Sequence, residues 1–491
     1  MQPTSLRSKT AITLKWNVID KVASQVLYAV TGIILARLLS QEDFGLVGAV
    51  LVFQAFASLL VDSGFSYALI QRKNPTETDY STVLWFNMTM AVGIYGILYF
   101  CAPYIAECFQ SDQRLIPLSR VMFISFILNA SAIVQVNRLM KQMNVKMIAV
   151  SNTIGLILAA IVGIWLAFAG YGAWAIVWQT IVLSAVKSLI LWISQHWLPR
   201  MEFSWASLRS FLGISTRMMF TSFLNTVFLN IYSFFIGNRV GMTSLGYYTQ
   251  SDKWSKMGIM SLYQVLTSSF LPALSAVQDD SIRYRQVCSK MNRFTAYLTF
   301  PTFIGLLIMA EPIFHILFGA KWDPSILLFQ LLFVRGIFTV FIGLYNNMLL
   351  ALGNAKIIMW LEIVRDGIAL IALILTFPYM AVSYPDNPVW GLSVLVVGQL
   401  VASFITWVIT LVYAGLKTGV GIKSLLLQPL PYLVFTLAIS AIMMYASSYC
   451  NNDYVMLGVE VMIGLCLYLG VNKLAGSEIQ NDALVFLMRK K

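Results

Sequence analysis

Charged side chains inside the longest apolar stretches of this sequence are the residues most able to do chemistry. A charge in hydrocarbon is costly, so it faces either a cavity or an opposite charge. Seven of these residues are basic: Lys21, Lys187, Arg217, Lys253, Lys256, Arg335 and Arg365. Six are acidic: Asp20, Asp62, Asp252, Glu362, Asp366 and Glu460. An uncompensated cation in such a place can hold an anion, and a carboxylate can bind a proton or a metal cation.

Spacing separates the charges that can neutralise each other from one that cannot. Asp252 and Lys256 are four residues apart and Glu362 and Arg365 are three apart, so each pair lies on one face of a helix. Both pairs fit a structural role as well as a functional one. Arg335 lies about midway along an apolar stretch, with no acid within a helical turn. We therefore expect Arg335 to meet either a distant acid or an anionic ligand.

The predicted binding set consists of cations that would attract a phosphate group, because arginine grips phosphate oxygens with two parallel hydrogen bonds and lysine supplies a point charge. Its members are Arg335, Arg217, Lys253, Arg365 and Lys21. Arg217 has an alternative, which is to snorkel to the membrane surface, and Asp20 can partly balance Lys21. The candidates for binding a coupled proton or sodium ion are Asp20, Asp62 and Asp252.

The sequence lacks the residue groups that bind metals, cofactors or nucleotides. Its five cysteines form no CxxC pair, and its two histidines, His196 and His315, are far apart. It has no GxxxxGK[ST] segment that would cradle a nucleotide. We therefore expect no metal, no cofactor and no catalytic residue, and a protein that is not an enzyme.

The stretches that position these charges are predicted membrane spans. Of the 491 residues, 59% are apolar and 11% are charged, and the mean hydropathy is +0.77, whereas a soluble chain has about 25% charged residues. Windows of about 20 apolar residues predict an all-α polytopic membrane protein with about fourteen transmembrane helices. Their predicted ranges are 14–37, 44–63, 81–104, 115–138, 146–169, 172–196, 211–237, 245–272, 294–318, 325–352, 356–378, 388–415, 429–449 and 454–474.

The basic residues outside the spans predict the orientation. If the N-terminus is cytoplasmic, 21 basic residues lie in inner loops and ends and 5 lie in outer loops, which is the bias that the positive-inside rule requires. Both termini are thus predicted to be cytoplasmic, and the first apolar segment lacks a signal-peptide cleavage site. The position of most basic residues on the cytoplasmic side then explains the net charge of +12. Nucleic acid is therefore excluded as a partner.

Two segments between spans have an amphipathic pattern. In 276–294, Arg283, Arg285, Lys290 and Arg293 occupy one side and apolar residues the other. We expect a helix on the inner membrane surface here, and a second one at 203–212. An ordinary basic loop is the alternative for both.

Short matches in the same order relate the two halves of the chain. The matched residues are Gly45 with Gly246, Pro103 with Pro312, Asn144 with Asn354, and Gln179 with Gln399. They predict two six-helix lobes in parallel repeat, with a cleft that opens to either side when the lobes rock, as in several transporter folds. The predicted domains are an N-lobe at 1–200, a C-lobe at 201–420, and two further helices with a cytoplasmic tail at 421–491.

Several motifs resemble those of one family of membrane transporters. The first half contains IQRKNPTETDYSTVLWFN at 70–87 and GYGAW at 170–174. The second half contains GMTSLGYYTQSDKW at 241–254 and AEPIFHILFGAKW at 310–322. These segments are similar to those of bacterial polysaccharide exporters, the Wzx-type flippases of the multidrug/oligosaccharidyl-lipid/polysaccharide exporter superfamily. The resemblance covers most of residues 10–420.

The resemblance implies a flippase for an undecaprenyl-pyrophosphate-linked oligosaccharide, which works by alternating access in the bacterial inner membrane and serves O-antigen, capsule or exopolysaccharide synthesis. In related lipid II flippases, a cationic cavity holds the pyrophosphate, and helices 13 and 14 form a groove for the prenyl tail. The implied partners are the lipid-linked oligosaccharide and the bilayer, with the polysaccharide polymerase or export machinery as a further option. The alternatives are a cation-coupled drug antiporter of the same superfamily, which would need an acid-dominated cavity, and a membrane polysaccharide polymerase or ligase.

Overall fold

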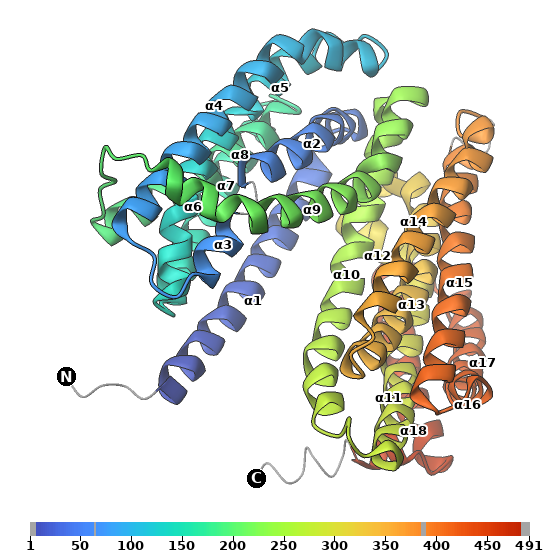
Figure 1. Ribbon diagram of the computed structural model, residues 1–491. Coiled ribbons are helices and arrows are strands. Elements are labelled where there is room, and N and C mark those ends of the chain that lie inside the picture. Colours follow the sequence, from blue (N-terminus) through green and yellow to red (C-terminus); the bar gives the residue numbers. More distant parts are fainter. Residues whose placement is uncertain (1–5, 63–64, 384–388, 483–491) are drawn as a thin grey trace. The chain divides into compact units, whose positions relative to one another are not determined.

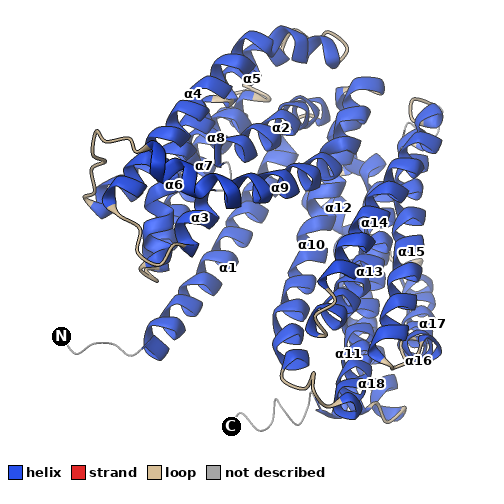
Figure 2. Ribbon diagram, viewed as in Figure 1, coloured by secondary structure: helices blue, strands red, loops and turns tan. Residues whose placement is uncertain are grey.

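The computed structural model describes residues 6–62, 65–383 and 389–482. Within these ranges every regular element is a helix and none is a strand (Figure 2). This follows from the apolar composition, because a backbone inside hydrocarbon must satisfy its N–H and C=O groups within its own helix or within a closed barrel. The predicted all-α polytopic class is confirmed.

The chain folds into two compact units, Met1–Gly246 (unit 1) and Tyr247–Lys491 (unit 2). The helices up to the end of unit 1 are α1 Leu6–Leu38, α2 Gln41–Asp62, α3 Phe65–Gln71, α4 Glu77–Cys108, α5 Leu115–Met122, α6 Ile124–Lys141, α7 Val145–Phe168, α8 Trp174–Gln195 and α9 Trp205–Arg239 (Figure 1). They continue with α10 Met242–Ser275, α11 Ser281–Ile308, α12 Ala310–Leu317, η1 Ala320–Trp322, α13 Asp323–Ala351, α14 Ala355–Thr376, η2 Phe377–Tyr379, α15 Trp390–Thr418, α16 Ile422–Leu427, α17 Leu430–Ser447 and α18 Asp453–Leu474. The lobe boundaries at residues 200 and 420 stay a prediction, and the end of the predicted tail, 483–491, lies outside the described residues.

Most of these helices are long enough to cross a membrane. Eleven helical segments in the described ranges are long and apolar enough to do so, or twelve if α11 and α12 form one broken span. The helices α9 and α14 lie at the predicted spans 211–237 and 356–378 but are not among them, and α14 carries Glu362, Arg365 and Asp366. The chain is a multi-span membrane protein, and the count of fourteen stays a prediction.

Short polar side chains mark where helices begin, because they bond the backbone N–H groups that the first turn leaves free. The Asp280 carboxylate accepts from the N–H groups of Ile282 and Arg283, each at 3.0 Å, so α11 begins at Ser281 and continues to Ile308 without a break. Ser204 caps α9 in the same way. The expected separate surface helices at 276–294 and 203–212 are therefore wrong, since these residues form the first turns of two long helices.

A sharp bend interrupts one predicted span. The range 294–318 is expected to be a single helix, but α11 and α12 meet at 60°. Pro312 lies in the first turn of α12, where its missing N–H group is tolerated; in the interior of a continuous helix it would break the hydrogen bonding. Helix α11 therefore ends at Ile308, and α12 begins at Ala310, with Met309 between them.

The motif at 70–87 ties together four elements of unit 1. The Asp79 carboxylate, whose side chain is 4% exposed, bonds Arg72 at 3.1 Å and the hydroxyl of Ser207, and so joins the start of α4 to the end of α3 and to α9. Glu77 pairs with Arg138 of α6 at 2.9 Å. Hydrogen bonds and ion pairs of this motif therefore link α3, α4, α6 and α9.

Two glycines that the repeat predicts to correspond make the same contact. A Cβ atom on Gly45 would overlap the carbonyl of Met242, and one on Gly246 would overlap the carbonyl of Gln41. Gln41 is the first residue of the helix that holds Gly45, and Met242 is the first residue of the helix that holds Gly246. Gly45 thus lets the start of α10 approach the backbone of α2, and Gly246 lets the start of α2 approach the backbone of α10.

The matched asparagines end the same turn in each half. The N–H groups of Asn144 and Asn354 donate to the carbonyl five residues earlier, at 2.9 and 3.0 Å. The residue before each has a left-handed backbone, with φ +57° at Met143 and +75° at Gly353. The predicted repeat therefore extends to the geometry of a helix end.

Gly353→Ala should destabilise the protein by about 1 kcal/mol or more, because an L side chain in this left-handed conformation is strained, although no atom lies within 4 Å of the added Cβ. The matched control is Gly96→Ala in the interior of α4, which also has open space around it and should gain up to about 1 kcal/mol of helix propensity. Thermal unfolding of the purified protein in detergent measures both, and a shift of the same sign in both variants would contradict the argument.

Candidate functional site

Arg335 lies on α13 and contacts a neutral side chain. Its Nη1 donates to Oε1 of Gln399 on α15, and Nε2 of Gln399 donates to the hydroxyl of Tyr248 on α10 at 3.2 Å. Gln399 and Tyr248 are buried, and Arg335 is partly exposed. No carboxylate among the described residues lies within ion-pair distance of Arg335. Of the two expected partners, a distant acid is not found among the described residues. Arg335 instead meets the neutral amide of Gln399, which leaves its positive charge uncompensated there.

Glycines bring the helices around Arg335 close together. A Cβ on Gly336 would come within 2.5 Å of Ile259 of α10, and a Cβ on Gly343 would overlap Tyr263 of the same helix. Each of these glycines of α13 therefore makes room for a bulky side chain of α10. In unit 2, α10, α13, α14 and α15 run alongside one another (Figure 1).

The two ion pairs predicted from spacing both form. Lys256 and Asp252 of α10 are 2.6 Å apart. Arg365 of α14 is 3.5 Å from Glu362 and 2.9 Å from Asp366. Arg365 is therefore flanked by two carboxylates, and Asp252 is already neutralised by a lysine.

The other predicted cations are placed separately. Lys253 of α10 is exposed, and its ammonium lies 5.6 Å from the ring centre of Trp254. Lys21 of α1 is exposed. The side chains of Arg217 and Asp62, on α9 and α2, lie outside what the structure describes. Among the described residues of unit 2, the contacts give Arg335, Lys253 and Arg365 different partners and do not join them.

Asp20 of α1 lies at the meeting point of three helices in unit 1. Its Oδ1 accepts from Asn152 of α7 at 3.1 Å and from Ser24 at 3.4 Å, and Asn152 also donates to Ser24 at 2.9 Å. Lys187 of α8 lies within electrostatic reach of the same carboxylate. The Asp20 carboxylate therefore accepts from one amide and one hydroxyl and lies near a lysine, and these groups stabilise its negative charge.

Sequence reasoning missed the partners of these charges. In the sequence, Gln399 is notable only as the repeat match of Gln179. No neighbouring residue in the sequence indicates its contact with Arg335, 64 residues away. Tyr248 lies in the motif at 241–254, and Asn152 had no signal. The reason is that each of these partners belongs to a different helix.

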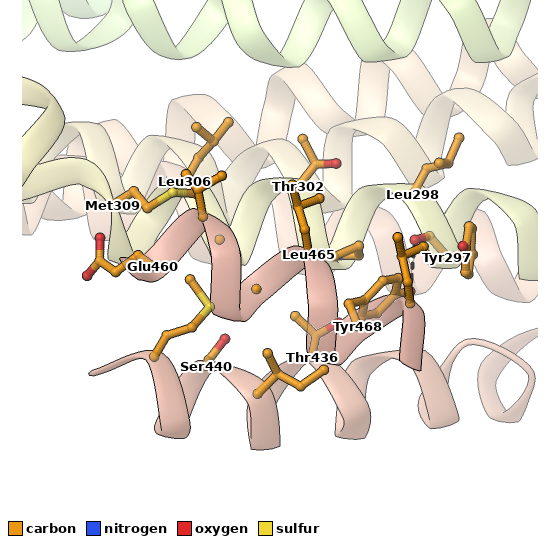
Figure 3. Close-up of a pocket in the computed structure, with 17 residues that line it drawn as sticks. Tyr297, Leu298, Thr302, Leu306, Met309, Thr436, Ser440, Glu460, Leu465 and Tyr468 are labelled. Atoms are coloured by element: carbon orange, nitrogen blue, oxygen red, sulfur yellow. Dashed lines mark hydrogen bonds between the residues drawn. The ribbon is translucent and has the colours of Figure 1, made fainter. Parts of the chain in front are cut away.

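A cavity of about 430 Å³ lies between α11, α17 and α18 in unit 2 (Figure 3). Most of its lining is apolar, with Tyr297, Tyr468, Thr436 and Ser440 supplying hydroxyl groups. Figure 3 shows Glu460 and Met309 at one end of the cavity and Tyr297 and Tyr468 at the other. The helices α17 and α18 correspond to the predicted spans 429–449 and 454–474. Such a lining suits a hydrocarbon chain with occasional hydrogen bonds.

Glu460 is the most unusual residue of this cavity. It is completely buried, and neither carboxylate oxygen has a partner in hydrogen-bond geometry among the described residues. The hydroxyl of Ser447 on α17 lies nearby but donates to the carbonyl of Met444. Glu311 of α12 is a second acid within electrostatic reach. An isolated buried carboxylate is costly unless a proton or a ligand neutralises it. Sequence reasoning counted Glu460 among the intramembrane acids but gave it no role.

The sequence of this chain is similar to those of proteins that build bacterial surface polysaccharides. The profile of the family described as "Polysaccharide biosynthesis protein" matches residues 34–327. The succinoglycan biosynthesis transport protein ExoT of Rhizobium meliloti is 26% identical over 74% of this chain and 74% of its own length. The lipopolysaccharide biosynthesis protein WzxC of Escherichia coli is 26% identical over 68% of each chain.

The fold is shared with solved transporter structures. The lipid II flippase MurJ, in an inward closed conformation, superposes with a TM-score of 0.73 over 92% of this chain and 97% of its own, at 15% identity. An inward-facing multidrug resistance transporter of the MATE family and MOP superfamily gives a TM-score of 0.61 over 83% and 98%, at 14% identity. At such low identity these similarities describe the fold alone.

Glu460→Leu should stabilise the protein by about 1 to 3 kcal/mol, because it removes an unsatisfied buried polar group and leaves an apolar side chain in an apolar place. Glu311→Leu is the matched control, and it should leave the stability unchanged because Glu311 is exposed. The measurement is the thermal unfolding midpoint in detergent. A lower midpoint for Glu460→Leu would show that the carboxylate has a stabilising partner.

Proposed function

Since the chain belongs to the family of polysaccharide biosynthesis proteins, we propose that it is a flippase, which translocates a lipid-linked oligosaccharide of the undecaprenyl-pyrophosphate type across the bacterial inner membrane by alternating access. The product would serve the synthesis of O-antigen, capsule or exopolysaccharide. The relatives named for succinoglycan transport and lipopolysaccharide biosynthesis support this proposal. The shared fold with a lipid II flippase agrees with it.

The observation that carries the proposal is the uncompensated charge of Arg335. A guanidinium has five N–H donors, and one terminal nitrogen of Arg335 donates to Gln399. The remaining donors are free to bind a ligand, and a phosphate accepts such donors in pairs. An arginine of this kind inside a membrane protein favours an anionic substrate over an organic cation, so it argues against the drug antiporter.

The substrate parts have separate sites in this proposal. Arg335 of unit 2 binds the pyrophosphate, with Lys253 of the same unit as a further cation. Lys21 and Arg217 belong to unit 1 and stay predictions from the sequence. Arg365 contributes less than these, because Glu362 and Asp366 already neutralise it. The prenyl tail occupies the cavity between α11, α17 and α18, whose lining is apolar. No reaction step is required, and no residue is proposed to be catalytic.

Asp20 is the proposed coupling residue of the transport cycle. What supports this role is that, among the described residues, its carboxylate is bonded by neutral groups, whereas Asp252 is paired with Lys256. Asp62 remains a second candidate. Both termini are proposed to be cytoplasmic, on the distribution of basic residues. A contact with the polysaccharide polymerase or export machinery stays a prediction.

Arg335→Ala should abolish glycan export while the protein still inserts in the membrane, because the pyrophosphate loses its main cation. The assay is the accumulation of lipid-linked oligosaccharide on the inner face of a deletion strain that carries the variant. Arg335→Lys keeps the charge but loses the planar fork, so we expect partial export.

Arg200→Ala is the control for this experiment, since Arg200 is exposed outside the spans. It should export normally at equal protein level. Normal export by Arg335→Ala would remove Arg335 from the mechanism.

Asp20→Asn should uncouple transport from the ion gradient, because an amide cannot take up the proton or cation. Export in vesicles should then no longer respond to an imposed proton or sodium gradient, whereas Asp252→Asn should still respond. An unchanged response of Asp20→Asn would transfer the coupling role to another carboxylate.

A further inference from the structure

A second cavity, of about 280 Å³, lies in unit 2. It is separate from the cavity between α11, α17 and α18. It is located where the first turns of α11 meet the turn after α15. Its lining residues are Arg285, Gln286, Ser289, Arg293, Gly419 and Val420. None of them is acidic, and two of them are arginines.

Arg285 is an exposed residue whose guanidinium lies against the backbone of Gly419 on the opposite wall. A Cβ on Gly419 would lie 2.6 Å from Nε of Arg285, so the absence of a side chain there makes room for the guanidinium. Gly419 ends α15 with φ +70°, a conformation that favours glycine in any case. Among the described residues, no carboxylate lies within ion-pair distance of Arg285. The guanidinium of Arg285 therefore lies beside Gly419, and no carboxylate of the described residues neutralises its charge.

Arg293 and Ser289 add donors that lack acceptors. Nη1 of Arg293 pairs with Glu478 at 2.8 Å, but its Nε is buried without a partner among the described residues. The Ser289 hydroxyl oxygen accepts from Gln428 at 3.1 Å, and its own O–H group has no acceptor within the described ranges. Arg285 and Ser289 of one helix thus offer N–H and O–H donors to the same space, and Arg293, which also lines it, is paired with Glu478.

This chemistry matches a tetrahedral oxyanion. Guanidinium groups bind phosphate oxygens in pairs, and a hydroxyl donor can take a third oxygen. Glu478 is the one acid in contact with a lining residue among those described, and it is already bonded to Arg293. Further cations flank the cavity at Lys417 and Lys423, and both are exposed.

The position along α11 indicates where the phosphate comes from. The helix continues from Arg293 into apolar residues that line the cavity described above, so the basic end lies at the membrane boundary. The distribution of basic residues predicts this boundary to be the cytoplasmic one. Basic pockets at this depth are suited to the headgroups of anionic lipids.

We propose that the cavity at Arg285, Ser289 and Arg293 is a binding site for a phosphate group, carried by an anionic lipid headgroup or free in solution. It is distinct from the proposed pyrophosphate site at Arg335 and does not depend on the protein being a flippase.

The test uses the purified full-length protein in detergent and measures the binding of phosphatidylglycerol, phosphatidylcholine and inorganic phosphate by native mass spectrometry and by the shift in thermal unfolding. Arg285→Gln is the main variant, because Arg285 has no ion pair whose loss would disturb the fold. Wild type should bind phosphatidylglycerol more tightly than phosphatidylcholine, and Arg285→Gln should weaken that binding about tenfold or more. Its unfolding midpoint in phosphatidylcholine should equal that of wild type.

Arg283→Ala is the matched control, since Arg283 is exposed two residues away on the same helix and does not line the cavity. It should keep the binding of wild type. Binding of phosphatidylglycerol but not of inorganic phosphate assigns the site to a lipid headgroup, and binding of inorganic phosphate without lipid assigns it to the free ion. Either result supports the site if Arg285→Gln removes it. Unchanged binding by Arg285→Gln, or an equal loss in Arg283→Ala, would overturn the proposal, because the basic surface as a whole would then be responsible.

Discussion

The cost of placing polar groups in hydrocarbon is the constraint on which the rest of this structure depends. It makes every regular element of the described residues a helix, since a helix satisfies its own backbone. It also determines how helices pack, because hydrocarbon surroundings give apolar side chains little reason to prefer protein over lipid. Glycine supplies contacts instead. Gly45 and Gly246 of unit 1 let backbones approach, and Gly336 and Gly343 of unit 2 make room for the side chains of Ile259 and Tyr263.

The same cost sorts the charged residues into two groups. Asp252 with Lys256, and Arg365 with its two carboxylates, are neutralised on their own helices, so their presence is explained by structure. Arg335 and Glu460 are not neutralised among the described residues, and both lie in unit 2. A protein retains such groups when a ligand compensates them during function. An anionic headgroup for Arg335 is the compensation that agrees best with membership in a polysaccharide biosynthesis family.

Asp20 and Arg335, two intramembrane charges whose hydrogen-bond partners are neutral, lie in different units of the chain. The same left-handed turn precedes Asn144 in unit 1 and Asn354 in unit 2. The polar clusters differ, however, with a carboxylate bonded to an asparagine on α7 in unit 1 and an arginine bonded to a glutamine on α15 in unit 2. The predicted repeat thus agrees in this turn, while the polar partners of Asp20 and Arg335 differ between the two units.

The sequence by itself determined the membrane class, the approximate helix positions, the family resemblance and the list of charges that need explanation, because hydropathy and spacing along one helix are local properties. It also predicted the ion pair of Asp252 with Lys256, which are neighbours on one helical face. It could not predict the bend at Met309 from hydropathy, nor the burial of Glu460. Only the tertiary structure decided that Arg335 contacts Gln399 and that Asp20 contacts Asn152. Side chains on a helix turn through about 100° per residue, so which face meets which neighbouring helix depends on the packing of the whole bundle, and no local pattern records it.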